Sequence, residues 1–280
     1  MPIPAPGTRH YNMGVQLAQS GDTDRAIEEF RKATEDDPRD VQAHHNLAVM
    51  LERKGDSEGA IAEFREALQV DPNLELTHLM LADALAGKGD LAGASEHYQS
   101  ALRLVPTDAR ANNNLGLLLR RQGDLDGAIA HYRRALATEP NNFPAHVNLG
   151  SALFAKGDLQ AAAKELKAAI ALKPDYPASH KLLAYVLFEM KDPNAALEEW
   201  KRAAKLDGYG ADTLAGMSIA QWQLGQKVQA LKSYRSAVAL DRAYVCNHDQ
   251  LKQRGQWNGR ALEVLQQVNK AAGPAVCAGS

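Results

Sequence analysis

The chain has few cysteines, little net charge and no long apolar run, and each shortage argues against a class of protein. Only two cysteines, Cys246 and Cys277, occur in 280 residues, which argues against a disulfide-dependent fold and leaves open whether the two pair. A net charge of −2 supplies no field that would attract nucleic acid or an anionic membrane surface. No apolar stretch approaches the roughly 20 residues of a membrane span. We therefore expect neither nucleic-acid binding nor membrane insertion.

The N-terminus also lacks the pattern of an export signal. Met1-Pro2-Ile3-Pro4 has no basic region followed by an apolar core. We expect a soluble protein and favour the cytoplasm. Export after removal of a signal stays open, because the repeats described next begin only six residues into the chain.

A period of 34 residues runs through most of the chain, kept by two series of alanines and one of prolines. The first series is Ala26, Ala60, Ala94, Ala128, Ala162, Ala196 and Ala230, the second is Ala33, Ala67, Ala101, Ala135, Ala169, Ala203 and Ala237, and the third is Pro38, Pro72, Pro106, Pro140 and Pro174. Self-similarity at such a period indicates stacked supersecondary units. A stack of this kind is mostly surface, which favours a binding function.

Residues 109–142 illustrate the local structure predicted for one repeat. Leu115 and Leu118 belong to an apolar stripe of helical spacing, and a second such stripe follows after a turn. Gly123 in this turn can end the first helix in a left-handed conformation, and Asp124 can cap the second. Each repeat is therefore predicted to be a pair of helices.

One turn departs from this pattern. Glycine occurs in six of the seven turns, and the exception reads Lys191-Asp192-Pro193. Asp192 can still cap the second helix, and Pro193 at the first helical position has no hydrogen bond to lose. We expect this turn to form without its glycine.

These residues resemble the tetratricopeptide repeat family, whose pattern is leucine and a small residue, followed by alanine, an aromatic residue, alanine and proline. One repeat matches this pattern at Leu115-Gly116, Ala128, Tyr132, Ala135 and Pro140. The resemblance implies an all-α solenoid, a right-handed superhelix of antiparallel helix hairpins. We place seven 34-residue repeats at residues 7–244, a degenerate repeat that forms a C-terminal capping helix pair at residues 245–272, and a flexible tail at residues 273–280.

The histidines raise the question of a metal or catalytic site. Five of the nine fall at the fourth position of their repeats, where the family places a packing residue: His10, His44, His78, His146 and His180. No cysteine or second histidine stands four residues away to complete a zinc site, and no phosphate-binding glycine loop is present. We predict no metal, no cofactor, no catalytic residue and no enzymatic activity.

The resemblance places the first helix of each repeat on the concave face, with position 6 pointing into the groove. Four repeats carry asparagine there: Asn12, Asn46, Asn114 and Asn148. An amide side chain both donates and accepts hydrogen bonds, which suits the backbone of an extended peptide. The series resembles the asparagine ladder in the repeat region of O-linked N-acetylglucosamine transferases. The alternative is that asparagine only occupies a polar helix face.

The other groove positions change in character along the chain. Arg110 and Arg121 belong to a basic stretch, which we expect to steer an acidic flank of the ligand. Later repeats contribute apolar residues: Val147, Phe154, Leu182, Tyr185, Phe188 and Trp222. An apolar stripe in an open groove predicts an interaction patch. The alternative is that the superhelix or the cap buries it.

The leading hypothesis is a non-enzymatic scaffold that binds an extended peptide or a partner helix in its concave groove. Two alternatives stay open. The first alternative is that the chain serves as the targeting or substrate-binding array of a larger enzyme, such as a glycosyltransferase. The second alternative is a structural protein that self-associates end to end.

Overall fold

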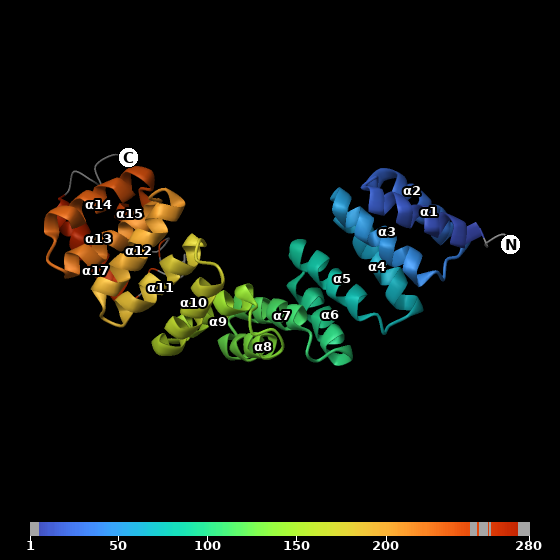
Figure 1. Ribbon diagram of the computed structural model, residues 1–280, viewed down its shortest axis with the longest axis horizontal. Coiled ribbons are helices and arrows are strands. Elements are labelled where there is room, and N and C mark those ends of the chain that lie inside the picture. Colours follow the sequence, from blue (N-terminus) through green and yellow to red (C-terminus); the bar gives the residue numbers. More distant parts are fainter. Residues whose placement is uncertain (1–5, 247–250, 252–256, 258, 274–280) are drawn as a thin grey trace. The chain divides into compact units, whose positions relative to one another are not determined.

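The computed structural model describes residues 6–246, 251, 257 and 259–273. In this part of the chain every regular element is an α-helix, as the repeat pattern predicts (Figure 1). The helices are α1 (Pro6–Ser20), α2 (Thr23–Asp36), α3 (Val41–Lys54), α4 (Ser57–Val70), α5 (Glu75–Gly87), α6 (Leu91–Leu104), α7 (Ala109–Arg121), α8 (Leu125–Thr138), α9 (Phe143–Lys156), α10 (Leu159–Leu172), α11 (Pro177–Glu189), α12 (Pro193–Asp207), α13 (Ala211–Gln223), α14 (Lys227–Leu240), α15 (Ala243–Cys246) and α17 (Gly259–Ala272).

The chain divides into two compact units, Met1–Leu118 and Leu119–Ser280. In the first unit α1 pairs with α2, α3 with α4 and α5 with α6, and each hairpin packs on the next. In the second unit α9 pairs with α10, α11 with α12 and α13 with α14 in the same manner, while α8 packs on α9. A single hairpin cannot bury its apolar faces alone, so the stability of each depends on its neighbours.

The helix ends form where the repeat pattern predicts them. Gly123 has a φ of 87°, which ends α7 in the left-handed region. The side chain of Asp124 accepts a hydrogen bond from the backbone N–H of Gly127 and so caps α8. The same cap recurs at Asp22, Asp56, Asp90, Asp158 and Asp192.

The turn without glycine also forms as predicted, but it requires an unfavourable backbone conformation. Lys191 has a φ of 64°. Asp192 caps α12 by accepting from the N–H of Ala195, and Pro193 stands at the start of the helix. A residue with a Cβ in the left-handed region costs roughly 1–2 kcal/mol, so this turn carries strain that the glycine turns avoid.

The core follows from the small residues of the repeat. All fourteen alanines of the two series are fully buried. Small residues on the first helices let an aromatic ring of the preceding or same hairpin approach closely. A Cβ added to Gly14 would lie 2.7 Å from the ring of Phe30, and one added to Gly216 would lie 2.3 Å from the indole of Trp200. The ring and the glycine are therefore complementary in size.

Helix α17 covers the end of the second unit by packing against α11, α13 and α14. Its inner face is apolar and its outer face carries exposed polar side chains: Glu263, Gln266, Gln267 and Lys270. This is the polar outer face that a terminal solenoid helix requires. Most of the first helix predicted for the degenerate repeat, Cys277 and the predicted tail beyond Gly273 lie outside the described residues.

Candidate functional site

The first helices of the first unit carry half-buried and exposed polar side chains, most of which contact polar side chains of a neighbouring repeat. We call this set the polar face, and it comprises Tyr11, Asn12, His45, Asn46, Asp83, Arg110 and Asn114. The amide nitrogen of Asn46 donates to the hydroxyl of Tyr11 over 3.2 Å. The ring Nδ1 of His45 lies 2.8 Å from the hydroxyl of Thr77. These bonds hold the polar side chains of neighbouring repeats in a fixed order.

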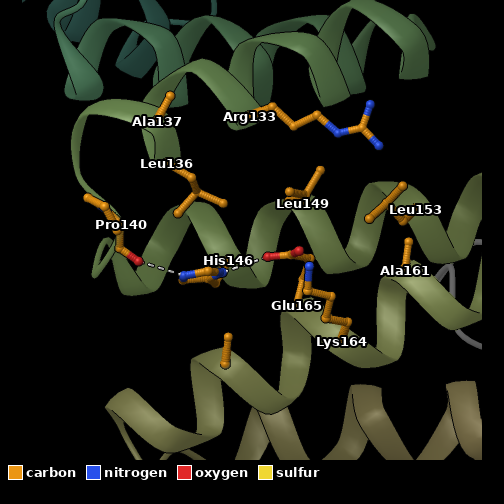
Figure 2. Close-up of a pocket in the computed structure, with 11 residues that line it drawn as sticks. Arg133, Leu136, Ala137, Pro140, His146, Leu149, Leu153, Ala161, Lys164 and Glu165 are labelled. Atoms are coloured by element: carbon orange, nitrogen blue, oxygen red, sulfur yellow. Dashed lines mark hydrogen bonds and ion pairs between the residues drawn. The ribbon is translucent and has the colours of Figure 1, made fainter.

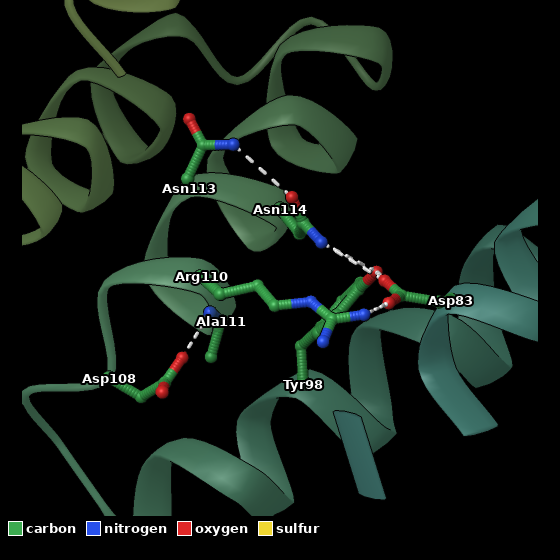
Figure 3. A network of polar contacts seen from close by, with 7 residues as sticks. All are labelled: Asp83, Tyr98, Asp108, Arg110, Ala111, Asn113 and Asn114. Carbon is green, nitrogen blue, oxygen red and sulfur yellow. Dashed lines mark hydrogen bonds and ion pairs between the residues drawn. The ribbon is translucent and has the colours of Figure 1, made fainter. Parts of the chain in front are cut away.

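Asp83 is the centre of the polar face, as Figure 3 shows. Its carboxylate accepts hydrogen bonds from the hydroxyl of Tyr98 and, over 3.0 Å, from the amide of Asn114, and it forms an ion pair with Arg110. Burial and the hydrogen bond to Asp83 together raise the pKa of Tyr98. Tyr98 therefore stays a neutral donor at physiological pH.

The predicted asparagine series is therefore not uniform. Asn114 uses its amide nitrogen on Asp83 and Tyr98, and its oxygen accepts from Asn113 over 3.2 Å. Asn46 uses only its nitrogen, and Asn12 is exposed on α1. Within the described part of the first unit, the carbonyl oxygen of Asn46 has no protein partner and is available to a ligand.

A cavity of about 530 Å³ opens beside Asn46, between α1 and α3. Val15, Ala18 and Phe30 supply apolar surface. Asn46, Met50 and Arg53 lie on the α3 side. The guanidinium of Arg53 is exposed, and the described residues supply it with no carboxylate partner. Asn46 alone of these residues belonged to the predicted site. The others lie at the same interface between repeats, and their distribution over the three helices α1, α2 and α3 gives no sequence motif.

The predicted apolar stripe of the second unit is not an open surface. Phe154, Leu182, Tyr185 and Phe188 are all buried, with Tyr185 0% and Phe188 1% exposed. Trp222 is half-buried, and the ammonium of Lys227 lies 3.5 Å from its ring centroid. The expectation of an exposed stripe is thus wrong for these four residues, and the alternative that they are buried is the correct one. The ring of Trp257 packs on Tyr185, and Arg260 of α17 lies over Phe188.

Three side chains converge on Asp212 to hold this cover in place. The hydroxyls of Tyr185 and Tyr244 and the indole N–H of Trp257 donate to the same oxygen, Oδ1, over 2.9, 3.0 and 2.8 Å. The rings also pack edge to face, with centroids 5.3 Å apart for Tyr185 and Trp257. The polar atoms of Tyr185, Tyr244 and Trp257 are thus satisfied within the protein.

A second contact fixes the start of α17. The carboxylate of Glu189, at the end of α11, accepts from the backbone N–H of Ala261 over 2.9 Å. It lies at the N-terminus of α17, where a negative charge is favourable. The guanidinium of Arg260 lies 5.3 Å from the ring of Phe188. Glu189 and Arg260 therefore orient α17 over the apolar stripe.

The other predicted residues of the second unit remain at the surface or near it. Arg121 is exposed, and Val147 and Asn148 are half-buried on α9. Beside them the guanidinium of Arg120 donates to the hydroxyl of Ser151 over 3.2 Å.

The histidines at the fourth repeat position are architectural, as predicted. In His146 the ring Nδ1 lies 2.7 Å from a carboxylate oxygen of Glu165, and Nε2 lies 2.9 Å from the carbonyl oxygen of Pro140. His44 and His180 make the same two contacts in their repeats. Each ring thus links the second helix of its own repeat to the end of the preceding one. The described residues contain no group of three side chains able to hold a metal.

Two family models, both of the tetratricopeptide repeat, match the chain, one at residues 11–75 and 79–143 and the other at residues 119–186. The chain belongs to the tetratricopeptide repeat family. Proteins of this family are typically protein-interaction scaffolds, and no enzymatic family is indicated. A comparison with curated protein sequences finds no match. In the described part of this tetratricopeptide repeat protein, no helix has the length and apolar character needed to span a bilayer.

Solved structures with the same fold support the assignment. A tetratricopeptide repeat protein from Parabacteroides merdae has a TM-score of 0.64 at 15% identity, covering 96% of this chain and 99% of its own. The pilF protein of Pseudomonas aeruginosa has a TM-score of 0.64 at 20% identity, covering 74% and 95%. YrrB, described as a TPR protein with an unusual peptide-binding site, has a TM-score of 0.61 at 21% identity, covering 67% and 97%. At these identities the likeness establishes the all-α tetratricopeptide solenoid.

Proposed function

We propose that this tetratricopeptide repeat protein is a non-enzymatic scaffold that binds an extended segment of a partner protein along the polar face of its first unit. The observation that carries the proposal is the cavity beside Asn46, which combines an apolar wall with an unused amide oxygen and an unpaired guanidinium. Sites for short peptides need this combination of an anchor pocket and polar groups that fix the backbone.

Each part of the cavity has a different role in this proposal. Phe30 and Met50 accept an aliphatic side chain of the ligand. Asn46 accepts from a backbone N–H of the ligand through its free oxygen. Arg53 pairs with a carboxylate, in the bidentate geometry that a guanidinium favours. The ligand is therefore an extended segment with an aliphatic anchor and a nearby acidic residue.

Other residues of the polar face are also expected to contact the ligand. Asn12 is exposed and can bond a ligand directly. Arg110 is half-exposed but already paired with Asp83, and Asn114 is bonded to the same carboxylate. These two residues contribute less to the affinity, because a ligand must replace bonds that the free protein already has.

In the second unit the proposed contacts are confined to the residues that α17 leaves accessible. Arg121, Val147, Asn148 and Trp222 extend the ligand surface there. The residues Phe154, Leu182, Tyr185 and Phe188 are core residues, and they contact a ligand only if the helices packed over them move apart. Such a movement exposes apolar area at a cost of roughly 25 cal/mol per Å².

The test is a selection of displayed random 16-residue peptides on the intact chain, followed by affinity measurements with the labelled peptides. Asn46→Ala is expected to weaken the selected peptides by about 0.5–1.5 kcal/mol, and Arg53→Ala to weaken the acidic ones. Arg31→Ala, at an exposed position on α2, is the matched control. If every selected peptide binds the Asn46→Ala and Arg53→Ala variants as tightly as the parent, the cavity is not the binding site.

A further inference from the structure

A second groove lies in the second unit, away from the residues proposed above. It is formed by two adjoining cavities of about 500 and 380 Å³ that share Arg133 and Leu153. Figure 2 shows the larger one: Arg133 and Leu136 come from α8, His146 and Leu149 from α9, and Lys164 and Glu165 from α10. Helix α9 is thus the floor, and the second helices α8 and α10 are the walls. We call this the α8–α10 groove.

The floor of the α8–α10 groove is apolar and rigid. Leu149 and Leu153 are each only 3% exposed, so they belong to the packed interior while presenting one side to the groove. Leu136 and Ala161 extend this apolar surface onto the two walls. A ligand with aliphatic side chains can bury them here without any rearrangement of the helices.

The carboxylates of the groove have partners within the protein, whereas two of its basic side chains have no carboxylate partner in the described part of the chain. Every carboxylate has a partner: Asp126 pairs with Lys156, Asp158 accepts from the N–H of Ala161, and Glu165 is bonded to His146. Arg133 and Lys164 are both exposed, and neither has a carboxylate partner among the described residues. The groove therefore presents two cations that no described carboxylate of the protein pairs with, whereas its carboxylates are held by Lys156, by a backbone N–H and by an imidazole.

Register shows that this charge arrangement is not a general property of the repeat. Residues 34 positions apart are equivalent, so each groove between consecutive second helices has its own pair at the positions of Arg133 and Lys164. Within a single unit the other pairs are Arg31 with Ala62, Arg65 with Glu96, Lys167 with Glu198, and Lys201 with Lys232. Only the last is also doubly basic, and there Lys201 is 2.7 Å from Glu198. Within the described part of each unit, the α8–α10 groove is therefore the place where both positions are basic and neither cation is paired with a carboxylate.

We propose that the α8–α10 groove is a second docking surface, for an acidic segment of a partner protein that carries aliphatic side chains. Charge complementarity favours this occupant: carboxylates of the segment pair with Arg133 and Lys164 while its aliphatic side chains cover Leu149 and Leu153. The two basic residues stand on opposite walls, so a bound segment is held from both sides. The surface is built by second helices and is independent of the polar face on the first helices.

The experiment uses the same selected 16-residue peptides on the intact chain. We expect a class of acidic, aliphatic peptides whose binding is weakened about tenfold or more by the double change Arg133→Glu and Lys164→Glu, because like charges then face each other. The matched control is Arg134→Glu with Lys167→Glu, the same charge change at exposed positions that do not line the groove. It should change affinity by no more than about twofold, since distant charges are screened.

Two further measurements separate this proposal from the first one. Peptides of this class should bind the Asn46→Ala and Arg53→Ala variants normally and should not compete with peptides that depend on Asn46. If the double reversal disturbs the helix content, Arg133→Gln with Lys164→Gln replaces it, with an expected loss of about threefold and a shallower salt dependence. The proposal is overturned if no selected peptide depends on Arg133 and Lys164, or if the control pair weakens binding equally.

Discussion

The two units each contain an aspartate that accepts hydrogen bonds from three side chains, but the two clusters have different surroundings. Around Asp83 the donors are Tyr98, Arg110 and Asn114, and the side chain of Asp83 is 32% exposed. Around Asp212 the donors are Tyr185, Tyr244 and Trp257, and all three of these residues are fully buried. The first cluster orders a surface, whereas the second anchors a cover. Equivalent faces of one repeat can thus serve binding or stability, depending on what packs over them.

The difference extends to the residues that face the groove. In the first unit position 6 of the second repeat is Asn46, which has space beside it. In the last repeat the same position is Gly216, where any Cβ would collide with the indole of Trp200. The larger ring of the second unit therefore excludes the asparagine.

The largest expected loss of stability follows from a change that removes the contact between Trp257 and the core of the second unit. Trp257→Ala removes a fully buried ring and one donor to Asp212, and large-to-small changes of this kind cost about 3–5 kcal/mol. Urea unfolding, with hydrogen exchange of α17, measures the loss. Trp222→Ala is the control, because that ring is only half-buried and should cost less than half as much. Equal costs for the two would contradict the assignment of Trp257 to the core.

A smaller effect compares the two aspartates directly. Asp212→Ala leaves three buried donors without their acceptor, and we expect a loss of about 2–3 kcal/mol. Asp83→Ala should cost about 1 kcal/mol or less, because Arg110 is exposed to water and the buried hydroxyl of Tyr98 keeps its hydrogen bond with Asn114. Asp212→Asn keeps one acceptor oxygen and should fall between them. A greater loss at Asp83 than at Asp212 would reverse the comparison.

A still smaller effect concerns the turn between α11 and α12. Lys191→Gly relieves a left-handed φ of 64° and should stabilise the second unit by about 0.5–1 kcal/mol. The reciprocal change Gly157→Lys, at an equivalent turn where φ is 86°, should destabilise by a similar amount. Thermal unfolding of both variants tests the signs. A destabilised Lys191→Gly protein would show that the lysine side chain has another role.

The last effect is a pH dependence of the first unit to which the pair His78 and His97 contributes. His78 Nδ1 lies 3.0 Å from His97 Nδ1, at a place where four other repeats pair histidine with glutamate. Burial, and secondarily the nearby His78, lower the pKa of His97. The unfolded chain therefore takes up this proton more readily, so stability should fall as the pH drops below about 6.5.

His97→Glu gives this repeat the histidine–glutamate pair of the others. The variant should lose less stability than the parent between about pH 7 and pH 5.5, as followed by chemical unfolding of the first unit. Identical pH profiles for parent and variant would show that the histidine pair is not the cause.

Much of the fold could be predicted because its determinants are local. Gly123 and Asp124 act within one turn, and the buried alanines follow from a fixed spacing. The packing role of the histidines was also predictable, because a recurring residue occupies a recurring environment. The strain at Lys191 follows from the same rule, since the turn demands a positive φ whatever residue stands there.

The state of the apolar stripe could not be predicted, because it depends on contacts between distant segments. Tyr185, Asp212 and Trp257 lie in different helices or beyond them, and no periodic pattern links them. Whether Phe188 faces water depends on how α17 packs. The cavity beside Asn46 and the α8–α10 groove have the same origin, because each is formed between successive repeats rather than within one.

The first-helix face of the first unit is the proposed ligand surface, whereas the aromatic residues Tyr185 and Phe188 on the first-helix face of the second unit belong to the core. Paired measurements of unfolding free energy and peptide affinity on Asn46→Ala and Phe188→Ala test this difference most directly, using a selected peptide that competes at the Asn46 cavity. We predict that Asn46→Ala weakens the peptide by about three- to tenfold with little change in stability. Phe188→Ala should cost about 3–5 kcal/mol of stability and leave the affinity of the folded protein unchanged. A Phe188→Ala protein that keeps its stability but loses the peptide would contradict the account.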